Sequence, residues 1–251
     1  MYRIMFEIAG FPIYSYGVMM FFAFLIPFLI ASKQASSREV KQEYLYDIVI
    51  MSIILAAVGG RLAFVILHWD YFSVAPWHEI LSIRDGGLTF YGGLILVLIG
   101  GFFYSRYRRI SMLFYLDYLI PYLALGYAIA RIGCFLNGCC YGIETESFLG
   151  VVIPTVDNVP RHPTQLYSFF AMLVVFAITY FIRERSRIRG EVFLSFIILY
   201  GIYRFIVEFF RVSEREVLGL TLAQIKILPF MVLALIILLI CLNREQDKSA
   251  K

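Results

Sequence analysis

The sequence predicts an all-α integral membrane protein with seven transmembrane helices. Of its 251 residues, 61% are hydrophobic and 18% are aromatic, whereas soluble globular chains are about 45–50% apolar. The apolar residues also fall into seven runs of roughly 20 residues, which is the length that a helix needs to cross a bilayer. We therefore expect a single membrane domain over residues 1–251.

The first four runs are separated by polar or glycine-containing segments. The first 12 residues are mixed, and they lack the charged start and cleavage site of a removable signal peptide. A polar segment with three basic residues ends the first run, and the long outer loop 68–86 ends the second. Trp69 and Trp77 in this loop suit a membrane interface. The expected spans here cover residues 14–31, 44–67, 87–104 and 112–132.

The last three runs follow a second long outer loop, residues 143–163. This loop ends in Arg161-His162-Pro163. Four arginines separate the next two runs, and a polar tail follows the last one. The expected spans cover residues 164–182, 192–210 and 221–242.

The basic residues predict the orientation of the spans. Loops after the first, third and fifth runs, together with the C-terminal tail, carry most of them: Lys33, Arg38, Lys41, Arg106, Arg108, Arg109, Arg183, Arg185, Arg187, Arg189, Arg244, Lys248 and Lys251. The opposite side has only Arg3, Arg84, Arg161, Arg211 and Arg215. Basic loops stay in the cytoplasm, so we expect the N-terminus outside and the C-terminus in the cytoplasm. The chain has a net charge of +4. Because its basic residues lie in short loops between apolar runs, we expect no nucleic-acid partner.

Polar residues inside the spans gather at one expected depth. At 1.5 Å per residue, Arg61 lies ~24 Å, Arg131 ~28 Å and Arg204 ~18 Å from the inner ends of their helices. Tyr16 and Tyr91 lie near the outer starts of theirs, and Arg161 and His162 lie just outside the membrane. A charge inside a bilayer is costly and marks a functional candidate. This shared depth favours a site in the outer leaflet over scattered structural arginines.

Residues spaced four, four and three apart line one face of the sixth span: Tyr200, Arg204, Glu208 and Arg211. Glu208 can neutralise either neighbouring arginine, and such pairing alone would offset their cost of burial. Arg131 and Arg61 then remain for an anion. The planar fork of arginine suits phosphate, and a phosphate at this depth belongs to a phospholipid head group.

Three of the four cysteines are close in sequence, at Cys134, Cys139 and Cys140. Their spacing does not match a zinc motif, and no histidine pair accompanies them. A disulfide on the outer face is an open alternative, although the adjacent Cys139 and Cys140 are poorly placed to form one. We expect neither a metal site nor a cofactor.

Several motifs together resemble the prolipoprotein diacylglyceryl transferase family. They are Ser15-Tyr16-Gly17, Gly59-Gly60-Arg61, Asp85 to Leu94, Ala130-Arg131-Ile132-Gly133, Asn137-Gly138, Tyr141-Gly142, Arg161 to Tyr167, Tyr200-Gly201 with Arg204, and Ile206 to Arg211. They follow in the family's order over nearly the whole chain, from Tyr16 to Pro229.

The resemblance implies a bacterial enzyme of the cytoplasmic (inner) membrane, with its active site near the outer leaflet. Such an enzyme transfers the diacylglyceryl group of phosphatidylglycerol to the lipobox cysteine of a secreted prolipoprotein. A thioether forms and glycerol phosphate is released. The implied partners are phosphatidylglycerol, the prolipoprotein signal peptide with its lipobox cysteine, and the lipid bilayer.

The resemblance also assigns roles by position. Arg131 and Arg204 stand at the family's essential arginines. Matching substrate-binding motif positions are Tyr16, Arg61, Asn137, Gly142, Arg161, His162, Tyr200 and Glu208. Tyr91 replaces a histidine often proposed as the catalytic base, Cys134 replaces a common asparagine, and Cys139 replaces a common glutamate.

The catalytic base is therefore open. The attacking thiol has a pKa of ~8.5, and arginines that hold the phosphate would also favour its thiolate. Tyr91, with an ordinary pKa of ~10, positions the lipid or accepts the proton. His162 is a second candidate, and a third possibility is that the electropositive pocket needs no side-chain base.

Two other function classes use the same residues. One is a phospholipid-binding or transport protein without chemistry, although the chain shows no internal repeat of the kind found in many transporters. The other is a relative of the family with a different lipid or thiol acceptor, as the three replaced positions would allow.

Overall fold

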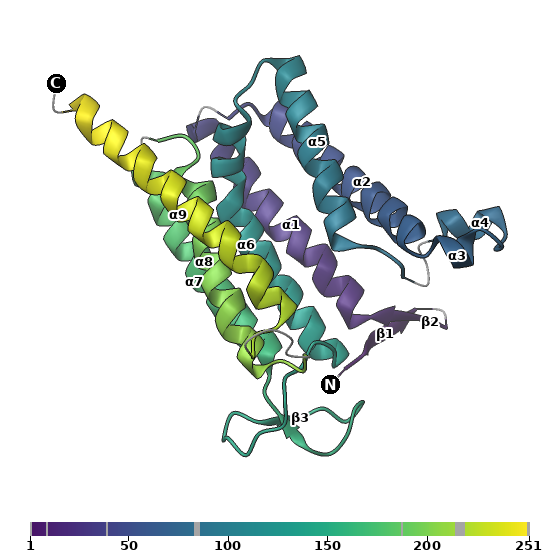
Figure 1. The fold of residues 1–251 in the computed structure, drawn as a ribbon. Coiled ribbons are helices and arrows are strands. Elements are labelled where there is room, and N and C mark those ends of the chain that lie inside the picture. The colour runs from purple at the N-terminus through teal and green to yellow at the C-terminus, as the bar shows by residue number, and fades with distance from the viewer. Residues whose placement is uncertain are drawn as a thin grey trace. The chain divides into compact units, whose positions relative to one another are not determined.

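A computed structural model describes residues 2–8, 10–38, 40–82, 86–186, 188–213 and 219–249. Within these residues, seven helices are long and apolar enough to cross a membrane. They are α1 (Ser15–Ala35), α2 (Gln42–Leu67), α5 (Phe90–Arg108), α6 (Met112–Asn137), α7 (Thr164–Arg185), α8 (Glu191–Val207) and α9 (Leu222–Ser249) (Figure 1). The predicted fold class, an all-α membrane protein with seven transmembrane helices, is confirmed, and the orientation of its termini stays a prediction.

Shorter elements lie between the long helices. Two antiparallel pairs of strands are present among the described residues, β1 (Ile4–Ile8) with β2 (Phe11–Tyr14), and β3 (Val151–Val152) with β4 (Pro160–Arg161). The loop after α2 contains α3 (Trp69–Phe72) and α4 (Trp77–Leu81). Two 3-10 turns, η1 (Ser36–Arg38) and η2 (Glu208–Phe210), follow α1 and α8. The sequence analysis predicted none of these elements.

The chain forms two compact units. Unit 1 comprises Met1–Lys33 and Leu116–Lys251, and unit 2 comprises Gln34–Tyr115. In unit 2, α2 and α5 pack closely through glycine. A Cβ on Gly59 would lie 2.5 Å from the Gly92 carbonyl oxygen, and one on Gly93 would lie 2.8 Å from the Ala56 carbonyl oxygen. Small residues permit such close approach of membrane helices.

The core of unit 1 lies among α6, α7 and α8. Its buried residues are Ala124, Ala128, Met172, Val175, Tyr203 and Val207. The start of α8 is fixed by Asp117 of α6, whose carboxylate accepts hydrogen bonds from the backbone N–H groups of Gly190 and Phe193. A carboxylate is favourable at the N-terminus of a helix, where N–H groups lack partners. This contact locks α6 to α8 and sets the register in which their functional side chains meet.

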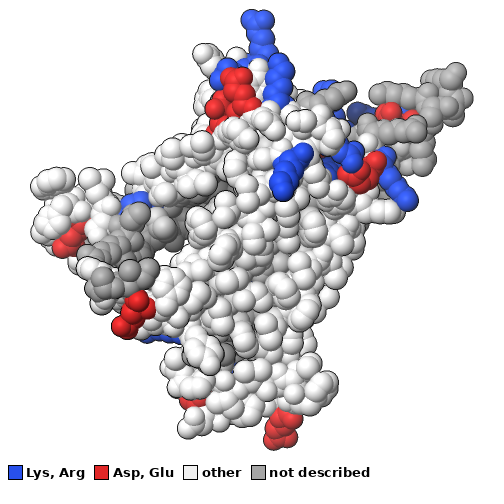
Figure 2. All heavy atoms as spheres, turned by 180° about the vertical axis from the view of Figure 1, so that it is seen from behind, with Lys and Arg blue, Asp and Glu red and all other residues white. Residues whose placement is uncertain are grey.

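The exterior is apolar. In the most apolar stretch of α9 only 6% of residues are buried, which suits a surface that contacts lipid. Figure 2 shows a wide area of the surface without Lys, Arg, Asp or Glu side chains. This distribution is typical of a multi-pass membrane protein.

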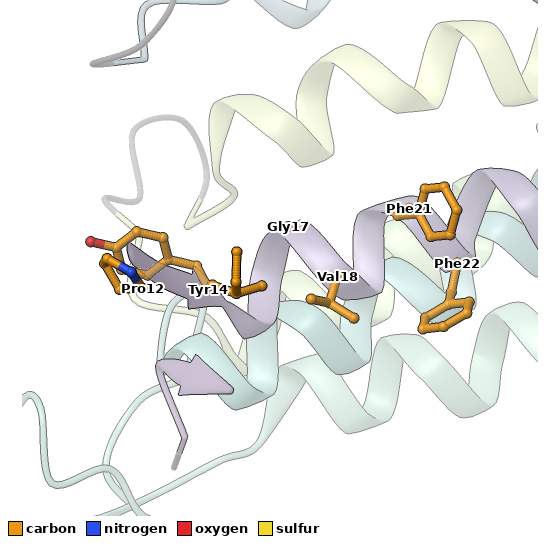
Figure 3. A pocket seen from close by; sticks show the side chains of 7 residues that line it. Pro12, Tyr14, Gly17, Val18, Phe21 and Phe22 are labelled. Carbon is orange, nitrogen blue, oxygen red and sulfur yellow. The ribbon is translucent and has the colours of Figure 1, made fainter. Parts of the chain in front are cut away.

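An apolar groove of about 440 Å³ lies where β2 meets the first two turns of α1. Figure 3 shows Tyr14, Val18, Phe21 and Phe22 along its wall. No charged side chain lines it. The groove therefore suits a hydrocarbon chain and not a phosphate group.

Candidate functional site

The site of unit 1 is built around the end of α6. The helix stops at Asn137 because Gly138 has a φ of +73°, a left-handed conformation that glycine adopts readily at helix ends. The N–H of Gly138 then bonds to the Phe135 carbonyl at 3.2 Å, and the N–H of Cys139 bonds to the Cys134 carbonyl at 3.1 Å. This cap turns the chain back toward the last turn of α6.

The segment after this turn is tied to the start of α7. The Thr164 hydroxyl donates to the Cys140 carbonyl and the Gln165 amide donates to the Cys139 carbonyl, both at 2.7 Å. Both side chains are buried. The Thr164 hydroxyl and the Gln165 amide nitrogen thus hold the backbone of the two adjacent cysteines in place.

Gly142 is tied to two further segments. Its N–H donates to the His162 carbonyl at 2.9 Å, and the N–H of Ile143 donates to the Phe210 carbonyl at the same distance. A Cβ on Gly142 would lie 2.8 Å from the His162 Cβ and closer still to the Phe210 carbonyl oxygen. Glycine is therefore required at position 142 because the backbones of Gly142, His162 and Phe210 approach one another closely.

Arg131 is held by tyrosine. Its guanidinium donates to the Tyr127 hydroxyl and lies over the Tyr127 ring, 4.5 Å from the centroid. The Tyr127 hydroxyl lies 3.5 Å from that of Tyr203, which donates to the Ser168 hydroxyl at 2.6 Å. Within the described part of the chain, no carboxylate lies at ion-pair distance from Arg131. A cation restrained by neutral groups keeps its full charge for a ligand.

Glu208 pairs with two arginines, as its spacing predicted. Its carboxylate lies 3.0 Å from a terminal nitrogen of Arg204 and 3.6 Å from Nε of Arg211. The Glu208 side chain is 4% exposed, whereas the two arginines are 23% and 26% exposed. One buried carboxylate between two cations leaves this cluster with a net positive charge.

The ring of Tyr200 packs against the tyrosine that holds Arg131, and Tyr200 lies on the same helix as Arg204. Its ring centroid is 6.0 Å from that of Tyr127 in an edge-to-face arrangement, and its ring stacks on Phe196 at 5.7 Å. It precedes Arg204 by one helical turn. Such aromatic pairs favour fixed geometry, so Tyr200 connects the helix face of Arg204 with the tyrosine that restrains Arg131.

Tyr16 and Asn137 frame the same end of α6. A Cβ on Gly133 would lie 2.9 Å from the Met19 Cβ and 3.5 Å from the Tyr16 ring, so Tyr16 packs against α6 within one turn of Arg131. Asn137 is the last residue of α6 and is half-buried. Unit 1 thus brings together most of the predicted site residues.

Arg161 has its charge satisfied within the outer loop. It pairs with Asp157 at 2.5 Å and with Glu144 at 2.9 Å, and its guanidinium lies over the Tyr141 ring at 5.5 Å. The hydrogen bond from Arg161 holds the pKa of the Asp157 carboxyl below its usual range. Arg161 therefore braces the loop, a role that the sequence pattern did not predict.

His162 lies in an aromatic setting at the base of this loop. Its Nδ1 lies 2.9 Å from the Tyr167 hydroxyl, and its ring packs edge to face on Phe210 at 5.0 Å. This hydrogen bond fixes the orientation of the imidazole. His162 is therefore positioned by α7 and η2, the segments that also hold Gly142.

Arg61 and Tyr91 belong to unit 2. Arg61 donates to the backbone carbonyls of Ile80 at 2.8 Å and of Gly87 at 3.2 Å, and its guanidinium lies over Phe64 and Phe72. The terminal nitrogens of the Arg61 guanidinium also donate to the backbone carbonyls of Glu79 and Gly86. Arg61 thus anchors the loop after α4, in which the motif residue Asp85 lies outside the described residues.

Tyr91 lies in the first turn of α5 and is 62% exposed. Its ring contacts Phe90 edge to face at 5.7 Å. Unlike the Arg61 guanidinium, the Tyr91 hydroxyl makes no hydrogen bond within the described residues of unit 2. Its hydroxyl is thus available at the surface of this unit.

Three cysteines meet at the end of α6. The sulfur atoms of Cys134, Cys139 and Cys140 lie within 4.8 Å of one another, and all three thiols are free. The sequence analysis expected no metal site because this spacing matches no zinc motif. The cluster depends on the backbone reversal at Gly138, and spacing along the chain does not reveal it.

Comparison with known proteins identifies the family. The sequence model of the family "Prolipoprotein diacylglyceryl transferase" matches residues 3–240. A phosphatidylglycerol–prolipoprotein diacylglyceryl transferase of Finegoldia magna is 34% identical over 224 residues, which are 89% of each chain. Proteins of the same name from Dehalococcoides mccartyi and Clostridium tetani are 36% and 33% identical, and the matches cover 82% and 84% of this chain and 81% and 86% of theirs. This chain belongs to the prolipoprotein diacylglyceryl transferase family.

Proposed function

We propose that this protein transfers the diacylglyceryl group of phosphatidylglycerol to the lipobox cysteine of a prolipoprotein, with release of glycerol phosphate. The observation that carries the proposal is Arg131, a cation on a helix long and apolar enough to cross a membrane, whose restraints are neutral hydroxyl groups. The relatives, whose names state this reaction, support it. The function requires an anionic lipid, and Arg131 supplies a reason to bind one.

Charge balance favours phosphate at this site. Glu208 offsets only one of the two arginines that it contacts, and Arg131 adds another positive charge. A buried charge without a partner is strongly unfavourable, so an anionic head group stabilises the site while the site binds it. Guanidinium groups donate two parallel hydrogen bonds to phosphate, which would fix the orientation of the glyceryl carbon.

The proposed reaction is a displacement at that carbon. The thiolate sulfur of the lipobox cysteine forms a bond to the glyceryl carbon as the bond from this carbon to the phosphate oxygen breaks. The electron pair leaves with glycerol phosphate. Arg131, together with Arg204, would stabilise the negative charge that develops on the departing oxygen. Glu208 and Tyr127 would orient these guanidinium groups.

Three routes can remove the thiol proton. Tyr91 stands at the position that the family resemblance gives to a histidine, so its hydroxyl accepts the proton or binds the head group. His162 is the second candidate, with its ring held by Tyr167. In the third route the arginines stabilise the thiolate, and the proton leaves to water. We rank Tyr91 first as a positioning or basic group.

We also infer the placement of the protein in the cell. The distribution of basic residues supports an N-terminus outside the cytoplasmic membrane of a bacterium and a C-terminus in the cytoplasm. In this orientation the last turn of α6 and the end of α8 lie near the outer leaflet. The thiol substrate is then the signal peptide of a prolipoprotein, which presents its lipobox cysteine there.

A transfer assay tests the reaction. Purified protein in liposomes receives a lipobox peptide and phosphatidylglycerol labelled either in an acyl chain or in the head-group glycerol. We expect the acyl label on the peptide and the glycerol label in free glycerol phosphate. A peptide with serine in place of the lipobox cysteine is the control and should remain unlabelled.

Other outcomes of this assay separate the alternatives. Transfer from phosphatidylethanolamine but not from phosphatidylglycerol would indicate a relative with another lipid donor. Movement of labelled lipid between leaflets without product would indicate a transporter, and either result would contradict the proposal.

Glu208→Gln tests the paired arginines. The substitution removes the charge that holds Arg204 and Arg211, and breaking one partner of a buried ion pair costs about 3–5 kcal/mol. We expect turnover to fall at least tenfold in protein that remains monodisperse. Glu146→Gln, on an exposed loop residue, makes the same chemical change and should leave turnover unchanged. Equal activity of the two variants would show that the ion pairs do not position the arginines.

Tyr91→Phe tests the hydroxyl of Tyr91 alone. If this hydroxyl is the base, turnover should fall by ~10²-fold or more, the usual scale of acid–base catalysis. If it only positions the lipid, the loss should appear in the apparent affinity for phosphatidylglycerol. Tyr91→His should retain activity. Tyr107→Phe, at the other end of α5, is the matched control.

Unchanged turnover and affinity in Tyr91→Phe would remove this residue from the mechanism. The proton would then leave through His162 or without a side-chain base, and His162→Gln would distinguish these two routes.

A further inference from the structure

The three cysteines at the end of α6 form a compact cluster of sulfur atoms. Cys134 lies in the last turn of the helix and is 8% exposed, whereas Cys139 and Cys140 are half-buried. Their sulfur atoms lie within 4.8 Å of one another. Three thiolates around one ion with metal–sulfur bonds of about 2.3 Å would be separated by about 4 Å. A small rotation of the side chains therefore suffices to close a three-sulfur site.

The backbone of this cluster is fixed in an uncommon conformation. Cys140 has a φ of +63°, a left-handed conformation that residues with a Cβ seldom adopt. The carbonyls of Cys139 and Cys140 accept hydrogen bonds from the buried side chains of Gln165 and Thr164. The surrounding structure thus enforces a backbone conformation that turns the third sulfur toward the other two, and such enforced outliers indicate function.

Two cations lie close to the cluster, one along the chain and one across a β-bridge. Arg131 precedes Cys134 by three residues on α6, which places both on neighbouring positions of one helix face. Arg211 forms a β-bridge with Gly142, two residues after Cys140. These guanidinium groups could offset the negative charge of the complex that three thiolates form with a divalent ion.

The donor set selects the kind of ion. Sulfur ligands without nitrogen or oxygen partners prefer soft ions such as Cu⁺, Zn²⁺ and Cd²⁺ over Mg²⁺ or Ca²⁺. We propose that Cys134, Cys139 and Cys140 bind one soft d¹⁰ metal ion through three thiolate sulfurs. The three ligands have no part in the proposed transfer reaction, and the metal site does not depend on that function.

Titration with Cd²⁺ alone tests this site. The full-length protein in detergent micelles is reduced, freed of reductant and titrated with Cd²⁺ while the sulfur-to-metal charge-transfer band is followed in the near ultraviolet. We expect one ion per chain, and three thiols protected against a thiol-modifying reagent once it is bound. Because binding releases thiol protons, the affinity should rise with pH. An excess of Mg²⁺ should not compete.

Single variants identify the ligands. We expect Cys134→Ser, Cys139→Ser and Cys140→Ser each to weaken Cd²⁺ binding at least tenfold, and Cys241→Ser, in α9, to leave it unchanged. Each variant is first compared with the wild type by thermal unfolding without metal. The count of protected thiols in the wild type tests the site independently of whether any variant folds.

Three results would overturn the proposal. One is the absence of a charge-transfer band in fully reduced wild-type protein. Another is protection of two thiols instead of three, which would show adventitious binding to a pair. The last is an equal loss of binding in Cys241→Ser, which would place the ion elsewhere.

Discussion

The hydrogen-bonded chain from Arg131 through Tyr127 and Tyr203 to Ser168 is the interaction on which the rest of the site depends. It connects α6, α8 and α7, and it restrains a half-buried cation with neutral groups. A carboxylate in the place of Tyr127 would stabilise the arginine equally well but would cancel its charge. The tyrosine ring instead stabilises the guanidinium through its π face and leaves the charge for an anionic lipid.

Other arginines of the chain show the contrast. Arg161 pairs with Asp157 and Glu144, and Arg61 donates to a set of backbone carbonyls. Both hold loops in place. Arg204 is intermediate, because it shares the single carboxylate of Glu208 with Arg211. Among Arg131, Arg161, Arg204 and Arg211 of unit 1, Arg131 therefore carries the least neutralised positive charge, in the last two turns of α6.

The sequence predicted the long helices well because apolar runs alone determine them. It placed their ends less well. The fourth span was expected to end at residue 132, but α6 continues to Asn137, since a single glycine at Gly133 does not stop a helix and the left-handed Gly138 does. The β1–β2 hairpin was missed because most of its side chains are exposed, so burial imposes no clear alternation on the sequence.

In the site, too, the sequence predicts contacts within one helix but not contacts between segments that are far apart along the chain. The pairing of Glu208 with Arg204 follows from four-residue spacing on a helix, and this spacing predicted it. The same rule applied to Tyr127 and Arg131 would have found the tyrosine restraint, whereas Tyr203 and Ser168 come from other helices. The cysteine cluster requires a reversal of the backbone, and no periodic pattern encodes it. The roles of Arg61 and Arg161 in holding loops depend on partners that sequence spacing does not show.

The central claim is that Arg131 binds the phosphate of phosphatidylglycerol, and lipid affinity measured without an acceptor peptide tests it most directly. Native mass spectrometry of the protein with phosphatidylglycerol and phosphatidylethanolamine would give the preference of the wild type and of Arg131→Lys and Arg131→Gln. Loss of a charge-assisted, two-pronged hydrogen bond should weaken phosphatidylglycerol binding roughly tenfold or more in both variants, because lysine keeps the charge but lacks the fork. Wild-type affinity for phosphatidylglycerol in correctly folded Arg131→Gln protein would contradict the account.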